Sequence, residues 1–200
     1  MTTARLVLRR PKLSDAAAMY GYGRDPEVTR YMDWRTHTTV ADAVAFLGGA
    51  ASRWDSGEEY SWAITVKPDD RTIGSIACRV RDHAVDLGYV LSRDHWRRGY
   101  ATEAAQKVLE WAATLADVYR VWAICDVENA ASARVLEKIG MSREGVLRRW
   151  AIRPNLPSLV SLLVMLSCTL GSAMPNTRIF RGHEKGDGHE SSALDHGGGR

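Results

Sequence analysis

Two kinds of hydrophobic pattern alternate along the chain. Short runs rich in apolar and β-branched residues predict strands, whereas apolar residues that recur every three or four positions predict amphipathic helices. The short runs place strands at Arg5–Arg9, Tyr60–Val66, Thr72–Val80, Val85–Leu91, Arg120–Cys125 and Arg143–Trp150. Helices are expected from Ser14 or Asp15 to about Tyr22, from Asp25 to near Met32 as a short turn, from Thr39 onward, at Tyr100–Leu115 and at Ala130–Ile139.

Capping residues and apolar faces support these helices. The spacing Thr39-Val-Ala-Asp42 is close to that of a capping box, and Gly140 suits the position just after a helix end. The helix from Thr39 is expected to bury a face made of Val44, Leu47, Ala51 and Trp54. The helix from Tyr100 is expected to bury Ala104, Val108, Trp111, Ala112 and Leu115.

The C-terminal part of the chain changes character twice. After Asn155-Leu-Pro-Ser158 comes the nearly continuous apolar run Leu159–Leu166, which predicts a final strand beside Arg143–Trp150. From Gly171 the chain is rich in Gly, Ser, His and charged residues, which cannot bury enough apolar surface to offset chain entropy. We therefore expect one domain over 1–170 and a disordered tail over 171–200, whose histidines (His183, His189 and His196) are expected in a solvated tail rather than at a metal.

The stretch from Asp86 to Ala105 predicts an anion-binding turn. A strand is followed by a short basic turn and then by a good helix former, so backbone N–H groups and the positive end of a helix dipole converge. Gly99 allows close backbone approach, and Arg97 and Arg98 add charge suited to phosphate oxygens. The spacing matches neither a P-loop nor Gly-x-Gly-x-x-Gly. A solvated arginine pair on an ordinary loop is the plainer alternative.

A second segment, Glu128–Met141, narrows the choice of protein family when it is taken together with the basic turn. Together the two segments closely resemble the Gcn5-related N-acetyltransferase (GNAT) superfamily, in its RimJ/RimL branch, which acts on ribosomal-protein N-termini. The resemblance covers roughly residues 4 to 153. Its matching pieces are Arg5–Arg9 with Asp15-Ala16, Gly88–Leu91, Trp96–Ala104, Asn129 with Ser132, and Leu136–Gly140. It implies an α/β (α+β) single domain with a mixed, mostly antiparallel twisted sheet of six to seven strands flanked by helices, splayed between 85–91 and 120–125.

The same resemblance implies a site for acetyl-CoA. The turn Trp96–Ala101, with Thr102, would hold the pyrophosphate, and the backbone of Val90, Leu91 and Ser92 would bond the pantetheine arm. Asn129 would bond that arm as well, Ser132 would lie near the thioester sulfur, and Arg134 would reach the nucleotide phosphate. Plainer alternatives stand beside each assignment. Val90 and Leu91 suit a core strand, Asn129 suits a helix cap, and Ser132 and Arg134 suit a helix surface. The cofactor-binding residues are then Val90, Leu91, Ser92, Trp96, Arg97, Arg98, Gly99, Tyr100, Ala101, Thr102, Asn129 and Arg134.

The general base is less clear from the sequence. Strand alternation places Asp86, Gly88 and Val90 on one face, which makes Asp86 the carboxylate best aimed at the cleft, unless it is a solvated strand end. Glu103 is a weaker candidate, because a first-turn carboxylate more often complements the helix dipole or pairs with Arg97. An α-amino group titrates near ~7.8, so such an acceptor requires little help from a base. Ser132 and Asp86 are the candidate catalytic residues, and Glu27, Asp33, Trp34 and His37 are expected on the acceptor side.

Composition narrows the functional classes. The chain has 200 residues, is 45% hydrophobic and carries a net charge of +3, which suits a polyanionic ligand but is too mild for nucleic acid. Its three cysteines (Cys78, Cys125, Cys168) are far apart, so neither a disulfide framework nor a metal site is indicated. No leader and no apolar run of the ~20 residues needed to cross a bilayer is recognised, so a cytoplasmic protein without membrane contact is expected.

These features favour an acetyl-CoA-dependent N-acetyltransferase that moves an acetyl group directly to a primary amine in a ternary complex. The rival is an acyl-CoA-binding module without turnover. A dinucleotide-dependent oxidoreductase lacks its early glycine fingerprint and downstream acid. The acceptor stays open between a ribosomal-protein N-terminus, a free amino acid, a polyamine and an antibiotic amine, and so does the choice between monomer and homodimer.

Overall fold

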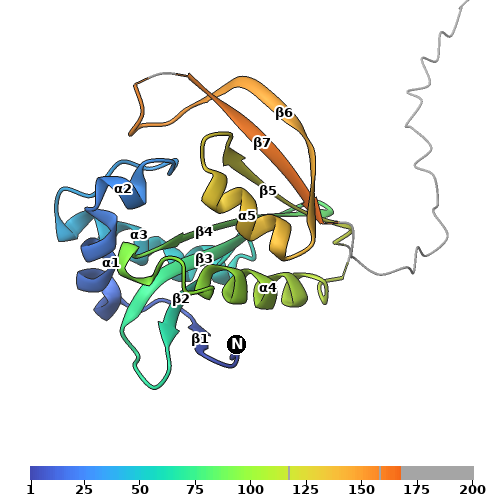
Figure 1. The fold of residues 1–200 in the computed structure, drawn as a ribbon. Coiled ribbons are helices and arrows are strands. Elements are labelled where there is room, and N and C mark those ends of the chain that lie inside the picture. The colour runs from blue at the N-terminus through green and yellow to red at the C-terminus, as the bar shows by residue number, and fades with distance from the viewer. Residues whose placement is uncertain (117, 158, 168–200) are drawn as a thin grey trace, which may run out of the picture.

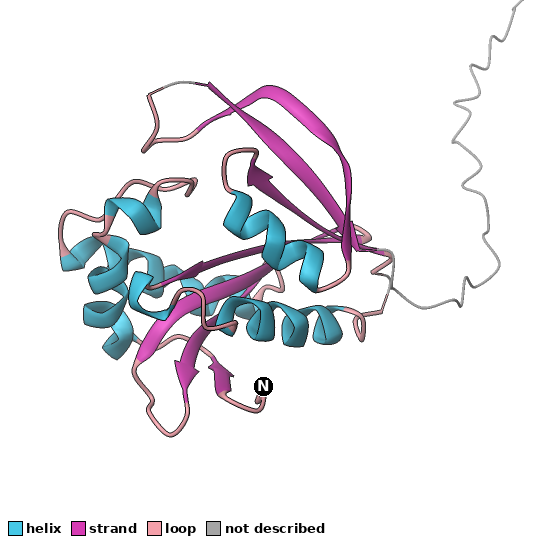
Figure 2. Cartoon of the chain, in the orientation of Figure 1, coloured by secondary structure: helices cyan, strands magenta, loops and turns pink. Residues whose placement is uncertain are grey.

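The computed structural model describes residues 1–116, 118–157 and 159–167. The expected tail at 171–200 and Cys168 lie outside the described residues. The helices lie on both sides of a twisted sheet (Figures 1 and 2). No helix in the described part is both long and apolar enough to cross a membrane. The strands are β1 (Leu6–Arg9), β2 (Glu59–Val66), β3 (Thr72–Arg81), β4 (Ala84–Leu91), β5 (Arg120–Asp126), β6 (Met141–Ile152) and β7 (Leu159–Ser167).

The helices are α1 (Ala16–Gly23), α2 (Pro26–Thr29), α3 (Val40–Asp55), α4 (Tyr100–Ala112) and α5 (Ala130–Lys138), with single 3₁₀ turns at Leu13–Asp15 and Arg93–His95. Every predicted strand and helix is confirmed, with shifted ends. The expected helix to Leu115 stops at Ala112, where Thr114 Oγ1 donates to the Trp111 carbonyl at 2.7 Å and the chain turns. The predicted capping box of α3 is present, with Asp42 accepting from the Thr39 N–H at 3.0 Å.

All seven strands form one sheet in the order β1-β2-β3-β4-β5-β7-β6. Each neighbouring pair is antiparallel except β4–β5, which is parallel, so the prediction of a mixed, mostly antiparallel sheet is confirmed. The apolar run at the C-terminus is β7, which lies beside β6 as expected. It also pairs with β5, and it is therefore an internal strand of the sheet.

The parallel pair β4–β5 is splayed. Register pairs join the two strands only at Ala84–Asp86 and Arg120–Trp122, although β4 continues to Leu91 and β5 to Asp126. Beyond Asp86 the strands separate, which leaves backbone groups of both strands without a ladder partner in the gap. The predicted splay between these strands is confirmed, and it opens toward the N-termini of α4 and α5.

Two clusters of buried side chains form the core. The larger joins the sheet to α4 and α5 and includes Cys78 and Cys125, which are buried as expected. The smaller joins α1 to α3. The predicted face of α3 is wrong in part, because Ala43, Leu47 and Ala50 are buried while Val44 is 44% exposed. Small alanines let α3 approach α1 closely, whereas Trp54 joins an aromatic group with Tyr60 and Trp62 at the helix end.

Candidate active site

The turn before α4 has the geometry of an anion cradle. Arg97 and Gly99 both adopt the left-handed conformation, with φ of 59° and 78°, and they alternate with Arg98. A turn of this kind directs successive N–H groups to one side, and the first N–H groups of α4 at Tyr100, Ala101 and Thr102 have no intrahelical acceptor. A non-glycine residue at positive φ is strained, which is common at ligand sites. Arg97 and Arg98 are exposed beside the turn.

An N-terminal clasp, formed by Thr3 and Arg5 against Glu103, holds this turn in place. Glu103 accepts from Thr3 Oγ1 at 2.6 Å and from Arg5 Nε at 2.7 Å. Arg5 also donates through Nη1 to the Arg98 carbonyl at 2.9 Å and lies over the Tyr100 ring. Burial alone would raise the pKa of Glu103, but the hydrogen bonds from Thr3 and Arg5 lower it. Of the two expectations for Glu103, its place in the first turn of α4 is confirmed, whereas the pairing with Arg97 is wrong, because Arg5, just before β1, reaches Glu103 instead.

Backbone direction along β4 decides which groups can face the gap. Ser92 N–H donates to the Ile73 carbonyl of β3 at 2.8 Å, so the backbone groups of Ser92, and of Val90 two residues earlier, turn toward β3. The Leu91 carbonyl turns the other way and accepts from Trp96 Nε1 at 2.7 Å. Of the proposed pantetheine contacts on this strand, Leu91 faces the gap, and Tyr89 shares its direction.

Ser132 and Asn129 lie at the start of α5, and Ser132 contacts Tyr89 of β4 where β4 and β5 have separated. Asn129 Oδ1 accepts from the Ser132 N–H at 3.1 Å, so Asn129 caps α5. The Ser132 hydroxyl lies 2.9 Å from Tyr89 Oη. Burial raises the pKa of Tyr89, so this phenol keeps its proton at neutral pH. The sequence gives no signal of a functional role for Tyr89, because a tyrosine in a strand is usually a packing residue. Arg134 lies exposed on α5.

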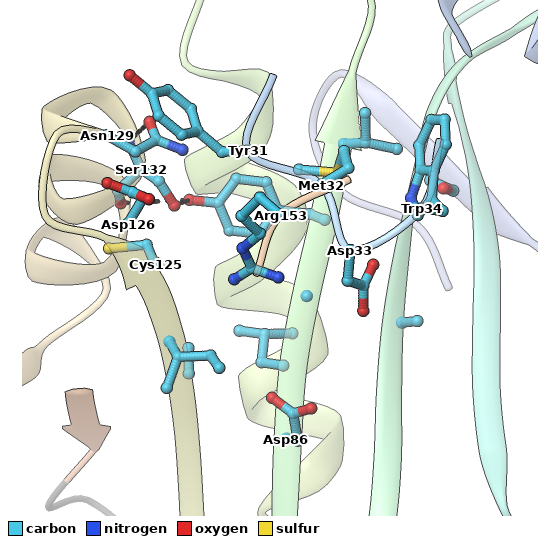
Figure 3. Close-up of a pocket in the computed structure, with 18 of the residues that line it drawn as sticks. Tyr31, Met32, Asp33, Trp34, Asp86, Cys125, Asp126, Asn129, Ser132 and Arg153 are labelled. Atoms are coloured by element: carbon cyan, nitrogen blue, oxygen red, sulfur yellow. Dashed lines mark hydrogen bonds between the residues drawn. The ribbon is translucent and has the colours of Figure 1, made fainter. Parts of the chain in front are cut away.

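A cavity of ≈ 380 Å³ extends from Ser132 along β4 (Figure 3). Asp86 lines the same cavity at the end away from Ser132 in Figure 3. Its carboxylate pairs with Arg79 at 3.2 Å, and Arg79 also pairs with Glu59 at 2.9 Å. Burial raises the pKa of Asp86, and the Arg79 charge opposes that shift. Asp86 lies three residues before Tyr89, or roughly 10 Å along the strand, too far for direct contact with an amine at Ser132.

Residues of α1, of α3 and of the segment between them form the other wall of the cavity. Asp33, Trp34 and His37 line the cavity, whereas Glu27 is exposed and does not. Trp34 packs against the His37 ring at a centroid distance of 4.8 Å, and burial lowers the pKa of His37, which keeps the imidazole neutral. Within the described residues, no group of three or more His, Cys, Asp or Glu side chains is placed to hold a metal ion.

The loop between β6 and β7 contributes Arg153 to the cavity wall. Asn155 fixes this loop to the α2 region: its Nδ2 donates to the carbonyls of Thr29 at 2.7 Å and Trp34 at 2.8 Å, and its Oδ1 accepts from the Thr36 N–H at 3.0 Å. Arg153, two residues earlier, points between the two walls in Figure 3. The sequence gives no local signal for this contact, because it joins segments about 120 residues apart.

Gly99→Ala should weaken coenzyme A binding by about tenfold or more, the worth of one charge-assisted hydrogen bond. A Cβ at Gly99 would lie 3.3 Å from Arg5 Nη2 and would have to keep φ at 78°, so the turn would shift its N–H groups. Gly140→Ala is the matched control, because Gly140 has φ of 87° and open space around it. Calorimetric titration with coenzyme A compares the two; equal affinity in both variants contradicts the assignment.

Known proteins resemble this chain in sequence and in fold. The acetyltransferase (GNAT) domain family model matches residues 5–142. The uncharacterized N-acetyltransferase p20 of Bacillus licheniformis is 34% identical over 149 residues, which cover 73% of this chain and 84% of that protein. A GNAT-family acetyltransferase from Bacillus anthracis superposes with a TM-score of 0.73 at 25% identity, over 83% of this chain and 96% of the other.

A further likeness concerns the fold. RimL, the ribosomal L7/L12 α-N-protein acetyltransferase solved in complex with coenzyme A, superposes with a TM-score of 0.75 at 17% identity, over 83% of this chain and 95% of the other. The domain model covers well over half of this chain, and the relative from Bacillus licheniformis is more than 30% identical over most of it. This chain therefore belongs to the GNAT family of acetyl-CoA-dependent N-acetyltransferases.

Proposed function

We propose that this enzyme transfers the acetyl group directly to a primary amine, with both substrates bound together, and that the acceptor is a protein N-terminal α-amine or a small-molecule amine. One observation carries the proposal. The splay between β4 and β5, which suits a pantetheine arm, opens at Ser132 into the same cavity that the α1–α3 side and the β6–β7 loop enclose. A thioester in the splay and an amine in the cavity would meet at Ser132, with no enzyme nucleophile required between them.

Separate residues bind acetyl-CoA and transfer protons. The Trp96–Ala101 turn and Thr102 bind the pyrophosphate, with Arg97, Arg98 and Arg134 as supporting charges, and Leu91 and Asn129 orient the arm. Acetyl-CoA supplies the acetyl thioester. As the new N–C bond forms and the C–S bond breaks, Ser132 gives its hydroxyl proton to the departing sulfur. Tyr89 Oη, at 2.9 Å, can return a proton to Ser132 and regain one from water, so both hydroxyls end the cycle protonated.

Asp86 is the proposed destination of the ammonium proton, through water. Its raised pKa brings the carboxyl closer to the working pH, which favours proton acceptance. An α-amine demands little here, because a group that titrates near ~7.8 is partly neutral at pH 7, whereas a lysine amine titrates near ~10.4. This difference supports an α-amine acceptor over a lysine side chain, since Asp86 lies away from Ser132 and acts only through a relay.

Release of free thiol from acetyl-CoA, measured with a panel of peptides and small amines, tests the proposal. We expect acceptor-dependent thiol release together with an acetylated product of the acceptor detected by mass spectrometry. A binding titration with coenzyme A runs in parallel. Coenzyme A binding without thiol release for any amine would instead indicate the acyl-CoA-binding module.

A further inference from the structure

Asp126, the last residue of β5, is buried with one oxygen unused. The residue is 2% exposed, and its Oδ1 accepts from the Glu128 N–H at 2.9 Å. Its Oδ2 is also buried, and within the described part of the chain it has no hydrogen-bond partner. A buried carboxylate oxygen without a donor is costly, so such a group in a cavity takes its donor from water or from a ligand that displaces the water. Asp126 lines the cavity beside Asn129 and Ser132 (Figure 3).

Arg153 lines the same cavity and has a buried donor, whereas Asp126 has a buried acceptor. Its Nε is buried and, in the described ranges, finds no acceptor. The loop that carries Arg153 is held by the four hydrogen bonds of Asn155 to Thr29, Trp34 and Thr36, so the guanidinium is directed into the cavity by a fixed segment. Among the described residues no ion pair joins Arg153 to Asp126 or to another carboxylate.

The other carboxylates that line the cavity are either paired or exposed to solvent. Asp86 and Glu59 both bind Arg79, and Glu59 also lies 3.4 Å from Arg53. Asp42 accepts from the N–H groups of Thr38 and Thr39 at the start of α3, and Asp33 is exposed to solvent. The cavity therefore offers an incoming molecule one buried anionic acceptor, Asp126 Oδ2, and one buried cationic donor, Arg153 Nε.

We propose that Asp126 and Arg153 form the acceptor-binding pair: Asp126 accepts a hydrogen bond from the amino group of the acceptor, and Arg153 binds a carbonyl or carboxylate oxygen next to it. The amino group binds as ammonium and loses one proton through water to Asp86 before it attacks the thioester. The acceptor class is an α-amino acyl group, present at the N-terminus of a peptide and in a free amino acid. Aliphatic diamines are disfavoured, because they carry no oxygen for Arg153 and would bring a second cation beside it. Asp126 lies at the Ser132 end of the cavity, so the amine is held where the thioester would lie.

This inference rests on the proposed function, and kinetics with four variants test it. Asp126→Asn keeps an acceptor for the Glu128 N–H while removing the charge, and Arg153→Met keeps side-chain length while removing every N–H. Glu128→Gln and Arg148→Met are the matched controls, since both residues are exposed. We expect the KM for the acceptor to rise about tenfold to hundredfold in the first two variants only. The KM for acetyl-CoA and the unfolding temperature should not change.

The acceptor panel separates the outcomes. Short peptides with free α-amines, free amino acids and aliphatic diamines are each supplied to the wild-type enzyme in the thiol-release assay. Turnover with peptides or with amino acids supports the pair and identifies which source is used. Preference for diamines, or an unchanged acceptor KM in both Asp126→Asn and Arg153→Met, overturns the inference while the proposed function stands. No thiol release with any amine overturns both.

Discussion

Replacing Ser132 with alanine is expected to lower kcat by about 10²–10⁴-fold, the range for a positioned general acid. The affinity for acetyl-CoA should stay close to that of the wild type. The reason is that the Ser132 hydroxyl matters most when negative charge develops on the departing sulfur, and an interaction made mainly in the transition state changes kcat more than substrate binding. Steady-state thiol release gives kcat, and calorimetric titration gives the acetyl-CoA affinity.

Two further variants show whether a loss of kcat comes from the Ser132 hydroxyl itself. Tyr89→Phe removes the hydroxyl 2.9 Å from Ser132 Oγ but keeps the ring, and it should lower kcat by a smaller factor if Tyr89 returns the proton. Ser52→Ala, at an exposed position of α3, controls for loss of a helical serine and should leave kcat unchanged. Wild-type turnover in Ser132→Ala would leave Ser132 with a structural role only, as the residue whose N–H is capped by Asn129.

The part of the site that sequence reasoning predicted is local in the chain. Gly99 and the residues around it form one strand–turn–helix unit, and Asn129 and Ser132 lie in one helical turn. Their relative geometry follows from helix and turn rules without knowledge of the rest of the fold. The apolar run of β7 was also recognisable, because seven of the eight residues from Leu159 to Leu166 are apolar, and so apolar a run predicts a strand within the sheet.

The missed residues depend on contacts between distant segments. Arg5 reaches Glu103 across about a hundred residues, and Asn155 brings the loop of Arg153 to the α2 region. Asp126 resembles an ordinary turn residue, since its Oδ1 bonds the N–H two positions later, and only the unused Oδ2 in a cavity marks it as different. Hydrophobic periodicity contains no information on which polar side chains meet across such distances.

A chain that ends at Pro157 should lose its fold and aggregate, whereas one that ends at Leu170 should stay folded and active. β7 lies between β5 and β6, so its removal exposes strand edges on both sides. It also removes Leu162 and Met165, which are 1% and 0% exposed and together contribute roughly 3–6 kcal/mol, a large share of the ~5–15 kcal/mol that stabilises a typical domain.

Thermal unfolding, size-exclusion chromatography and thiol release compare the two truncated chains with the full chain. The cut at Leu170 tests the proposed domain 1–170, since it removes only the segment from Gly171, which has few large apolar residues. Retained folding and activity there, with aggregation of the shorter chain, fit a domain that ends with β7. If the chain ending at Pro157 were folded and active, β5 and β6 would have to pair with each other, and the internal position of β7 would be wrong.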